Sequence, residues 1–438
     1  MIDTFASIFR IEELRRRILF TLGMLIVYRI GGHIPTPGVD GSVLTQALSG
    51  DSIFGLLDLF AGGAFAKATI FALGIMPYIS ASIMLQLLGA VVPYLQRLQR
   101  EGEEGRRKIT QYTRYLTVLI AALQAWGTAG FISTISSGTG ISAVHMSSTW
   151  FIPLTIITFT CGCIFIMWLG EQITERGIGN GISLIIFIGI IARFPDAVVE
   201  EIQMLWHGTR GFITEILMVA MMLAVIAAVV LITRAQRRIP VQYPRKVVGR
   251  RVFGGATTHL PLSVNSAGVI PIIFAQSIMF LPSTIAQLPY FRDTDWIQNL
   301  IAYTLAPGGF WYSIIYALII IFFAYFYTAI VFNPMEIADN MRKNGGYIPG
   351  IRPGKNTAQY VEKVLTRITL PGALFFAAIA VLPWVLISQA GVNYFFGGTG
   401  LLIVVGVALD TLQQIESHLM MRHYDGFLKK GKIRGRSM

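Results

Sequence analysis

The chain has 438 residues, of which 54% are hydrophobic and only 13% are charged. A soluble globular domain carries about 25% charged residues, so this composition excludes an ordinary soluble protein of the same length. The formal net charge of +12 would suit nucleic-acid binding in a soluble protein. In a membrane protein, however, a basic excess is typical of cytoplasmic loops and of contact with anionic lipid.

Apolar segments close to the roughly 20 residues that cross a bilayer as a helix recur along the whole sequence. The first follows Arg15, Arg16 and Arg17 and continues without a small-residue cleavage site, so we interpret it as an uncleaved span and not as a signal peptide. In all, the sequence predicts ten membrane-spanning helices, at residues 18–34, 68–92, 112–132, 151–170, 180–194, 212–233, 264–287, 310–332, 369–389 and 396–415.

The distribution of Lys and Arg orients these spans. Most of the 35 basic residues lie in the N-terminal segment, the C-terminal tail and the loops that alternate onto the same side. Because cytoplasmic loops carry the excess of Lys and Arg, both termini are predicted to be cytoplasmic. The basic residues left for the outer side and its span ends are Arg29, Lys67, Arg193, Arg210 and Arg292.

Residues 52–66 are apolar but too short to cross a bilayer, which favours a re-entrant element. Gly62 and Gly63 provide a hinge before the next span, and Asp58 is easier to place beside water than beside lipid. An interfacial helix that lies flat on the membrane is the alternative.

The sequence contains none of the common motifs for nucleotide binding, zinc hydrolysis or a serine nucleophile. The two cysteines, Cys161 and Cys163, lie inside one apolar segment, and the six histidines are scattered among loops and span ends. Glu171 and Asp410 lie near predicted span ends, where we expect interfacial or helix-end contacts and no proton relay. We therefore predict no catalytic residue, no metal site and no cofactor, and the chain is not expected to be an enzyme.

Four stretches carry a specific resemblance. They read FALGIMPYISASI at 71–83, TERGIGNGIS at 174–183, NSAGVIP at 265–271 and MRKNGGYIPGIRPG at 341–354. Together with the ten-span plan, they closely resemble the SecY family, whose members are the central subunits of the Sec protein translocon. The resemblance covers essentially the whole chain, and it is weakest in the outer loops 134–150 and 288–308.

The resemblance implies an all-α integral membrane fold with ten transmembrane helices in two inverted five-helix halves, residues 1–210 and 211–438, plus a short re-entrant plug helix. The channel would be aqueous and hourglass-shaped, and it would open sideways to lipid between the second and seventh spans. Segment 52–66, called the plug from here on, would close it from the outer side. The plug residues singled out are Phe54, Leu57, Asp58, Phe60, Gly62 and Gly63.

The resemblance also implies a ring of apolar side chains at the waist of the channel, formed by Ile75, Ile79, Ile182, Ile186, Ile273 and Ile403. Ile75 and Ile79 are four residues apart and therefore share a helix face, and Ile182 and Ile186 repeat that spacing. An apolar constriction blocks ions by excluding water, without a specific filter. From spacing alone, packing or lipid contact explains these isoleucines equally well.

The basic inner loops 234–261 and 334–367 fit the docking of cytosolic partners. By resemblance, Arg238, Arg250, Arg251 and Arg352 would dock the motor ATPase SecA or a ribosome, since arginine pairs bidentately with carboxylate or phosphate. The bias of basic residues towards the inside explains the charge excess as well. It does not explain the turn around Arg352, where Pro and Gly residues bracket the arginine.

The leading hypothesis is a protein-conducting channel of the bacterial cytoplasmic (inner) membrane, which passes unfolded secretory polypeptides across and releases membrane spans sideways. Its expected partners are the small membrane subunits SecE and SecG, SecA, the ribosome, signal sequences with their unfolded preproteins, and anionic lipid. The alternative is a secondary transporter of a small solute with a midplane site. That alternative predicts buried ionisable groups, which the predicted spans largely lack.

Overall fold

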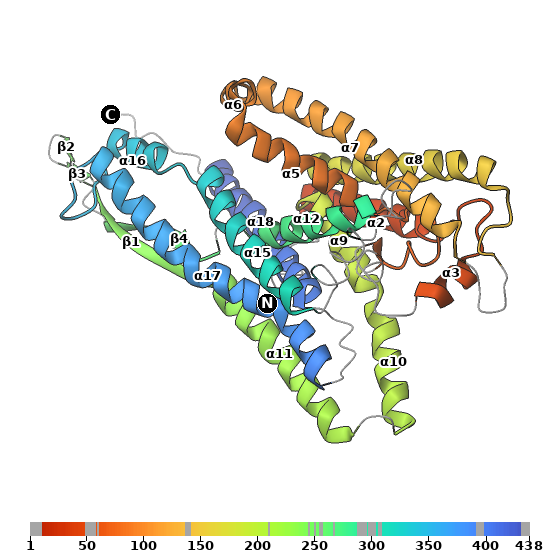
Figure 1. Cartoon of the computed structure of the whole chain (residues 1–438). Helices are drawn as coiled ribbons and strands as arrows, with labels where there is room; N and C mark the ends of the chain where they lie inside the picture. Colours follow the sequence, from red (N-terminus) through yellow and green to blue (C-terminus); the bar gives the residue numbers. More distant parts are fainter. Residues whose placement is uncertain are drawn as a thin grey trace. The chain divides into compact units, whose positions relative to one another are not determined.

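The computed structural model describes residues 11–48, 58, 61–135, 142–208, 211–243, 246–248, 251–253, 257–265, 268–286, 296, 304, 309–390 and 398–430. The chain is shown in Figure 1. It divides into two compact units. The first unit comprises Met1–Ile202, Phe280–Ala302 and Val407–Met438, and the second comprises Gln203–Met279 and Tyr303–Gly406. The division into inverted halves at residue 210 stays a prediction about topology.

Each of the ten predicted spans overlaps a helix. These helices are α2 (Glu12–Gly31), α5 (Met76–Val91), α7 (Glu103–Ile132), α8 (Ser148–Arg176), α9 (Gly181–Ala192), α11 (Phe212–Arg234), α12 (Ile270–Ala286), α15 (Phe310–Val331), α17 (Lys355–Ala390) and α18 (Gly398–Lys430). Among the described residues, seven helices are long and apolar enough to cross a membrane, or eight if the bent pair of α5 and α6 (Pro93–Arg100) forms one span. The protein is thus a helical membrane protein that crosses the bilayer several times.

The first unit is built around α7 and α8, which lie side by side, with α5, α9 and α2 packed against them. Close approach depends on glycine. A methyl group at Gly162 of α8 would lie 2.0 Å from the carbonyl oxygen of Ile70, and one at Gly181 would lie 2.0 Å from that of Gly170. Helix α3 (Gly41–Leu48) precedes the plug, and α10 (Phe194–Trp206) follows α9.

The second unit has its own apolar core between α11, α12, α15, α17 and the start of α18. Tyr316 and Leu402 are fully buried there, beside Ile272, Ile320 and Phe376. Because α15 and α17 lie together along much of their length, their large side chains fill this core without a contribution from the first unit.

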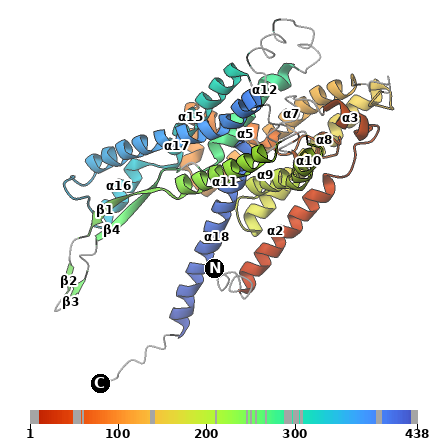
Figure 2. The same ribbon diagram turned by 90° about the horizontal axis from the view of Figure 1, so that it is seen from below.

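The basic loop between α11 and α12 is not irregular but forms an antiparallel hairpin of β1 (Gln236–Gln242) and β4 (Thr257–Ser263). A short pair, β2 (Lys246–Val248) and β3 (Arg251–Phe253), lies at its far end. Figures 1 and 2 both show β1 and β4 beside α16 (Pro334–Lys343) and α17. The all-α prediction missed this hairpin, although Ile239 and Val241 alternate with exposed residues as a half-buried strand requires.

The second predicted span, residues 68–92, begins later than hydropathy suggests. Helix α5 starts at Met76, with Pro77 in its first turn, where a missing N–H costs nothing. Before it, residues 62–75 form turns and one isolated bridge, from Thr69 to Pro35, instead of helix. Gly74 has a positive φ of 55° there, and even Ala68 has a φ of 46°, so the backbone of this apolar run is not helical.

Candidate functional site

The start of α9 is built by the TERGIGNGIS stretch. Asn180 caps the helix, and its side-chain oxygen accepts the N–H groups of Ile182 at 3.1 Å and Ser183 at 3.4 Å. The Thr174 hydroxyl donates to the Gly170 carbonyl and accepts the Gly181 N–H, both at 2.9 Å. This tight turn between α8 and α9 fixes where the ring candidates on α9 lie.

Four of the six ring candidates lie in the first unit. Ile75 is buried at the N-cap of α5 and Ile79 is buried in its first turn, while Ile186 is buried in the middle of α9. Ile182 is only partly buried, and its side chain lies beside Gly170 of α8. Each pair therefore presents two isoleucines one turn apart, as the spacing predicted.

The other two ring candidates, Ile273 on α12 and Ile403 on α18, lie in the second unit. Ile273 is 6% exposed and Ile403 is fully buried. Within that unit Gly406 of α18 leaves no room for a side chain beside Val269, the residue before α12. A ring that gathers all six isoleucines stays a prediction.

Asp58, Gly62 and Gly63 are the plug residues that the structure describes, while Phe54, Leu57 and Phe60 lie outside the described residues. Gly62 and Gly63 have φ values of 66° and 85°, a left-handed conformation that favours glycine. A methyl group at Gly62 would lie 2.9 Å from Cα of Gly189 on α9, whereas one at Gly63 would meet no atom within 4 Å. The predicted hinge therefore has a left-handed backbone, and its first glycine touches α9.

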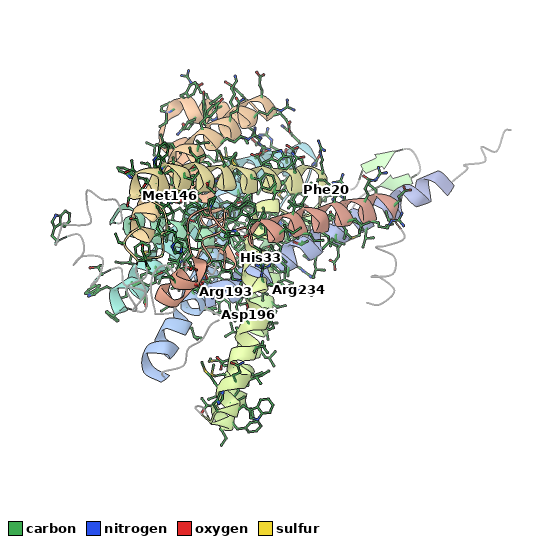
Figure 3. The ribbon with its side chains drawn as sticks, turned by 90° about the vertical axis from the view of Figure 1, so that its right-hand side faces the viewer. Phe20, His33, Met146, Arg193, Asp196 and Arg234 are labelled. Carbon is green, nitrogen blue, oxygen red and sulfur yellow. The ribbon has the colours of Figure 1, made fainter. Side chains whose placement is uncertain are left out.

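Asp58 makes contacts in two directions. Its Oδ1 accepts the Ala66 N–H at 2.8 Å, and its Oδ2 accepts a hydrogen bond from Arg193 Nη1, also at 2.8 Å. Burial raises the pKa of the Asp58 carboxyl above its ordinary value, and Arg193 acts in the opposite direction. Arg193 ends α9, and Figure 3 labels it with Asp196 where α9 passes into α10.

A second arginine holds the hinge. Arg29, in the last turn of α2, donates from Nη1 to the Gly62 carbonyl at 3.1 Å. Sequence reasoning counted Arg29 and Arg193 as outer charges but gave neither a role. The sequence did mark these two residues, because most Lys and Arg residues of this chain are predicted to lie on the inner side and these two are not.

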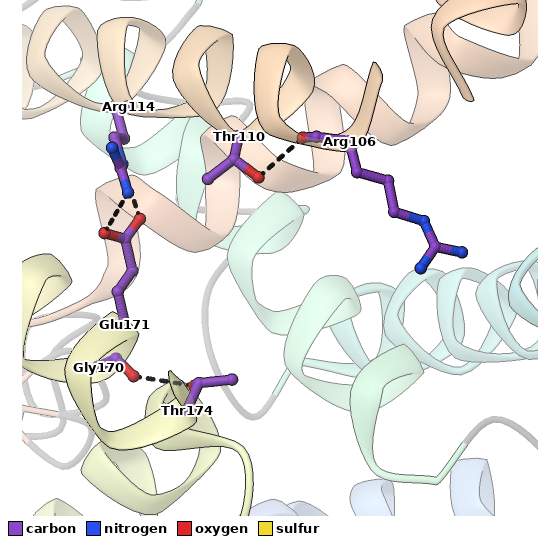
Figure 4. Close-up of polar contacts among 6 residues, drawn as sticks. All are labelled: Arg106, Thr110, Arg114, Gly170, Glu171 and Thr174. Carbon is purple, nitrogen blue, oxygen red and sulfur yellow. Dashed lines mark hydrogen bonds and ion pairs between the residues drawn. The ribbon is translucent and has the colours of Figure 1, made fainter. Parts of the chain in front are cut away.

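Arg114 of α7 and Glu171 of α8 form a bidentate ion pair, with N–O distances of 2.9 and 2.8 Å (Figure 4). The Glu171 side chain is 14% exposed and that of Arg114 is 44% exposed. The expected helix-end contact of Glu171 is thus a specific bridge between two spans, close to the C-terminal end of α8. No group of three or more potential metal ligands occurs among the described residues.

The two basic inner loops are joined in the second unit. The backbones of Gln242 at the end of β1 and Tyr347 after α16 exchange two hydrogen bonds of 2.9 and 3.0 Å, and the Tyr347 hydroxyl donates to the Gln242 side chain at 3.1 Å. Arg238 on β1 and Arg352 in the turn before α17 are both exposed. Arg251 lies on β3, and Arg250 lies outside the described residues. The joined loops present at least two of the four predicted docking arginines to solvent.

Comparisons with known proteins agree with this architecture. The sequence profile of the SecY family matches residues 69–412. The chain is 48% identical to the protein translocase subunit SecY of Streptomyces scabiei over 98% of this chain and 100% of that protein. It is 46% identical to the subunit of Thermotoga maritima over the whole of both chains. The chain belongs to the SecY family.

The SecY profile covers all four motif stretches and all six ring candidates, while the plug lies before it and is covered by the full-length relatives. Solved structures share the fold at low identity. A protein-conducting channel matches with a TM-score of 0.71 at 19% identity, over 96% of this chain and 95% of that one. Sec61 in the canine ribosome–channel complex matches with a TM-score of 0.67 at 18% identity, over the same shares of the two chains.

Proposed function

We propose that this chain is the central subunit of a channel that conducts unfolded polypeptides across the cytoplasmic membrane of a bacterium and releases membrane spans sideways into the lipid. The observation that carries the proposal is the relation to translocase subunits at 46–48% identity over full length. No chemistry of its own is required, since a motor or a ribosome would supply the energy. The secondary-transporter alternative finds no specific support.

The closed state would depend on two seals. The isoleucine ring would exclude water at the waist, because apolar side chains dewet a narrow pore. The plug would add a second barrier on the outer side. In this it would resemble a structural neighbour with a TM-score of 0.68 at 18% identity, described as having a plug domain that stabilises the closed state and maintains a membrane seal.

Opening to lipid would occur between α5 and α12, the helices of the second and seventh predicted spans. Signal sequences would enter there, and the joined inner loops would dock SecA or a ribosome through Arg238, Arg250, Arg251 and Arg352. SecE and SecG are the expected membrane partners, both termini would be cytoplasmic, and anionic lipid would contact the basic inner face.

The test is reconstitution of the chain with its small membrane subunits and SecA in vesicles, with a radiolabelled preprotein outside. We expect ATP-dependent protection of the preprotein from added protease. A folded complex that shows no uptake, or that instead carries a small solute down an ion gradient, contradicts the proposal.

A further inference from the structure

Outer basic residues are scarce in this chain, and those that the structure describes gather at the plug. Of the five, Arg29, Lys67 and Arg193 are described. Arg29 binds the hinge carbonyl, Arg193 binds Asp58, and Lys67 follows the plug directly and is near enough to act on the Asp58 carboxyl through its charge. Because topology disfavours outer cations, two of them acting on the Asp58 carboxylate and a third bound to the hinge need a local explanation.

The Asp58 carboxylate has a separate role for each oxygen. Oδ1 holds the plug's own backbone by accepting the Ala66 N–H, and the Asp58 carbonyl accepts the Gly63 N–H at 2.9 Å. Oδ2 instead binds Arg193, which lies 135 residues further along the chain. The first oxygen therefore shapes the plug, and the second fastens it to α9.

One side of α9 carries both ring candidates of this helix and two contacts to the plug segment. Ile182, Ile186, Gly189 and Arg193 follow one another at intervals of four, three and four residues, which places them on the same helix face. Two are ring candidates, the third touches Gly62, and the fourth binds Asp58. The same helix face thus links the waist of the proposed channel to the plug.

We propose that Arg193 is a positioning residue that seats the plug on α9: it is the counter-ion that allows the Asp58 carboxylate to leave water, while Arg29 holds the hinge through Gly62. This inference rests on the proposed channel function. It assigns the plug a seat on one helix of the first unit and names the two cations that hold it there.

The two partners of this ion pair differ in exposure, and this difference predicts different effects of removing each one. The Asp58 side chain is 6% exposed, whereas that of Arg193 is 26% exposed. Removing Arg193 would leave the buried carboxylate without its directly bonded counter-ion, with Lys67 acting only through its charge, which is strongly unfavourable. Removing the Asp58 charge would leave a long cationic side chain that can reach water. Loss of the cation should therefore unseat the plug much more than loss of the anion.

The experiment compares Arg193→Met, Asp58→Asn and the double variant, each purified with its membrane subunits. Resting ion conductance of the complexes in planar bilayers reports plug seating. We expect Arg193→Met to raise the resting conductance about tenfold, a factor that corresponds to about 1.4 kcal/mol. Asp58→Asn should raise it no more than about twofold, and the double variant should fall back close to Asp58→Asn alone.

Outer pH supplies a second readout that general damage to the fold would not produce. Protonation removes the uncompensated charge of Asp58, so the conductance of Arg193→Met should fall as the outer solution is acidified. The charged groups that act on Asp58 are Arg193 and Lys67, and neither loses its charge on acidification. The double variant should show no such pH dependence, because the amide that replaces the Asp58 carboxyl does not titrate in this range.

Controls separate this inference from the proposed function. Arg193→Lys keeps the positive charge, so its resting conductance should stay near the wild-type level. Asp196→Asn is a second control, which removes an exposed carboxylate beside Arg193 and leaves Asp58 unchanged. If the two single changes raise the resting conductance equally, or if the conductance of the double variant is the sum of both increases, the proposed seat is wrong. Preprotein uptake by the wild type would still support the channel function in that case. Absence of uptake by the wild type instead overturns the channel itself.

Where a variant is poorly stable, plug exposure gives the answer independently. With Cys161 and Cys163 replaced, a cysteine at buried Ala61 should resist a membrane-impermeant maleimide in the wild-type background. In the Arg193→Met background the same cysteine should react at least several-fold faster. Adding Asp58→Asn to that background should restore most of the protection. Equal reactivity in all backgrounds contradicts the seat.

Discussion

Basic residues serve different purposes at the two faces of the protein. On the face predicted to be inner they are abundant, and Arg238 and Arg352 are exposed on the joined loops. On the face predicted to be outer they are few, and Arg29 and Arg193 are bound to a carbonyl and a carboxylate of the same plug segment. An exposed cation can orient the chain and attract partners, whereas a partly buried one fixes an internal contact. Changes at the two faces should therefore have separable effects.

The largest effect is expected at the inner face. Arg352→Glu should lower SecA-dependent preprotein uptake at least about tenfold, because a central arginine anchor at an interface is worth about 2 kcal/mol or more. Resting conductance should stay at the wild-type level, the opposite of the result expected for Arg193→Met. The measurement pairs an uptake assay with bilayer conductance.

Lys343→Glu is the matched control for this change, since Lys343 is exposed in α16 of the same loop and the change alters charge equally. We expect it to slow uptake no more than about threefold, through the general field alone. If both variants lose uptake equally, Arg352 is one charge among many and not an anchor.

The hinge glycines should show the next largest effect. Both need a positive φ, so alanine at either costs roughly 1–2 kcal/mol of backbone strain. Only Gly62 also touches α9, where a methyl group would lie 2.9 Å from Cα of Gly189. Gly62→Ala should therefore raise resting conductance several-fold more than Gly63→Ala. The opposite order would indicate that the plug does not rest on α9.

The helices were largely predictable, because about 20 apolar residues in a row leave the chain few alternatives in a bilayer. The start of α5 was not, since the run before it is apolar yet held in turns. The Thr36 N–H donates to the Ala68 carbonyl at 2.8 Å, and the Ile70 N–H donates to the Ile34 carbonyl at 3.0 Å. These contacts to a distant segment satisfy backbone groups that hydropathy would assign to a helix.

The site was predictable to a lesser degree. Spacing placed Ile75 with Ile79 and Ile182 with Ile186, because one helix fixes each pair. The partners of Asp58 could not be deduced, since Arg193 lies 135 residues away and only the folded chain brings the two together. What the sequence did provide was the scarcity of outer cations, which marks Arg29 and Arg193 as candidates for internal contacts.

The pair of Arg114 and Glu171 is a second ion pair between distant segments, on the side predicted to be inner. Glu171 is the more buried partner, so Arg114→Met should lower the melting temperature of the complex more than Glu171→Gln does. We expect a loss of about 2 kcal/mol and about 1 kcal/mol respectively, or a few degrees at most. Differential scanning fluorimetry measures this, and resting conductance should not change. A leak in either variant would mean that the inner pair also affects the seal.

The smallest effect is expected at Asp40, in the loops predicted to be outer. Its backbone N–H donates to the Ala143 carbonyl at 2.9 Å, and its side chain accepts the Ser42 hydroxyl at 2.6 Å. These bonds from the Ser42 hydroxyl and N–H hold the pKa of Asp40 below its ordinary value. A depressed pKa means that the stabilisation is complete above the ordinary carboxyl pKa of about 3.9 and is lost as the pH falls through the lowered value.

Hydrogen exchange of the segments around residues 40 and 143 can test this effect. Protection in the wild type should be constant from neutral pH to about pH 5 and should decrease only below about pH 4. Asp40→Asn, compared at each pH to remove the intrinsic exchange rate, should show no such step. Because the Asp40 side chain is only partly buried, at 39% exposed, the difference should be confined to these loops and leave the plug unaffected. If protection of residues 61–66 also decreased below about pH 4, the outer loops and the plug would open together. The outer cations would then stabilise more than the plug.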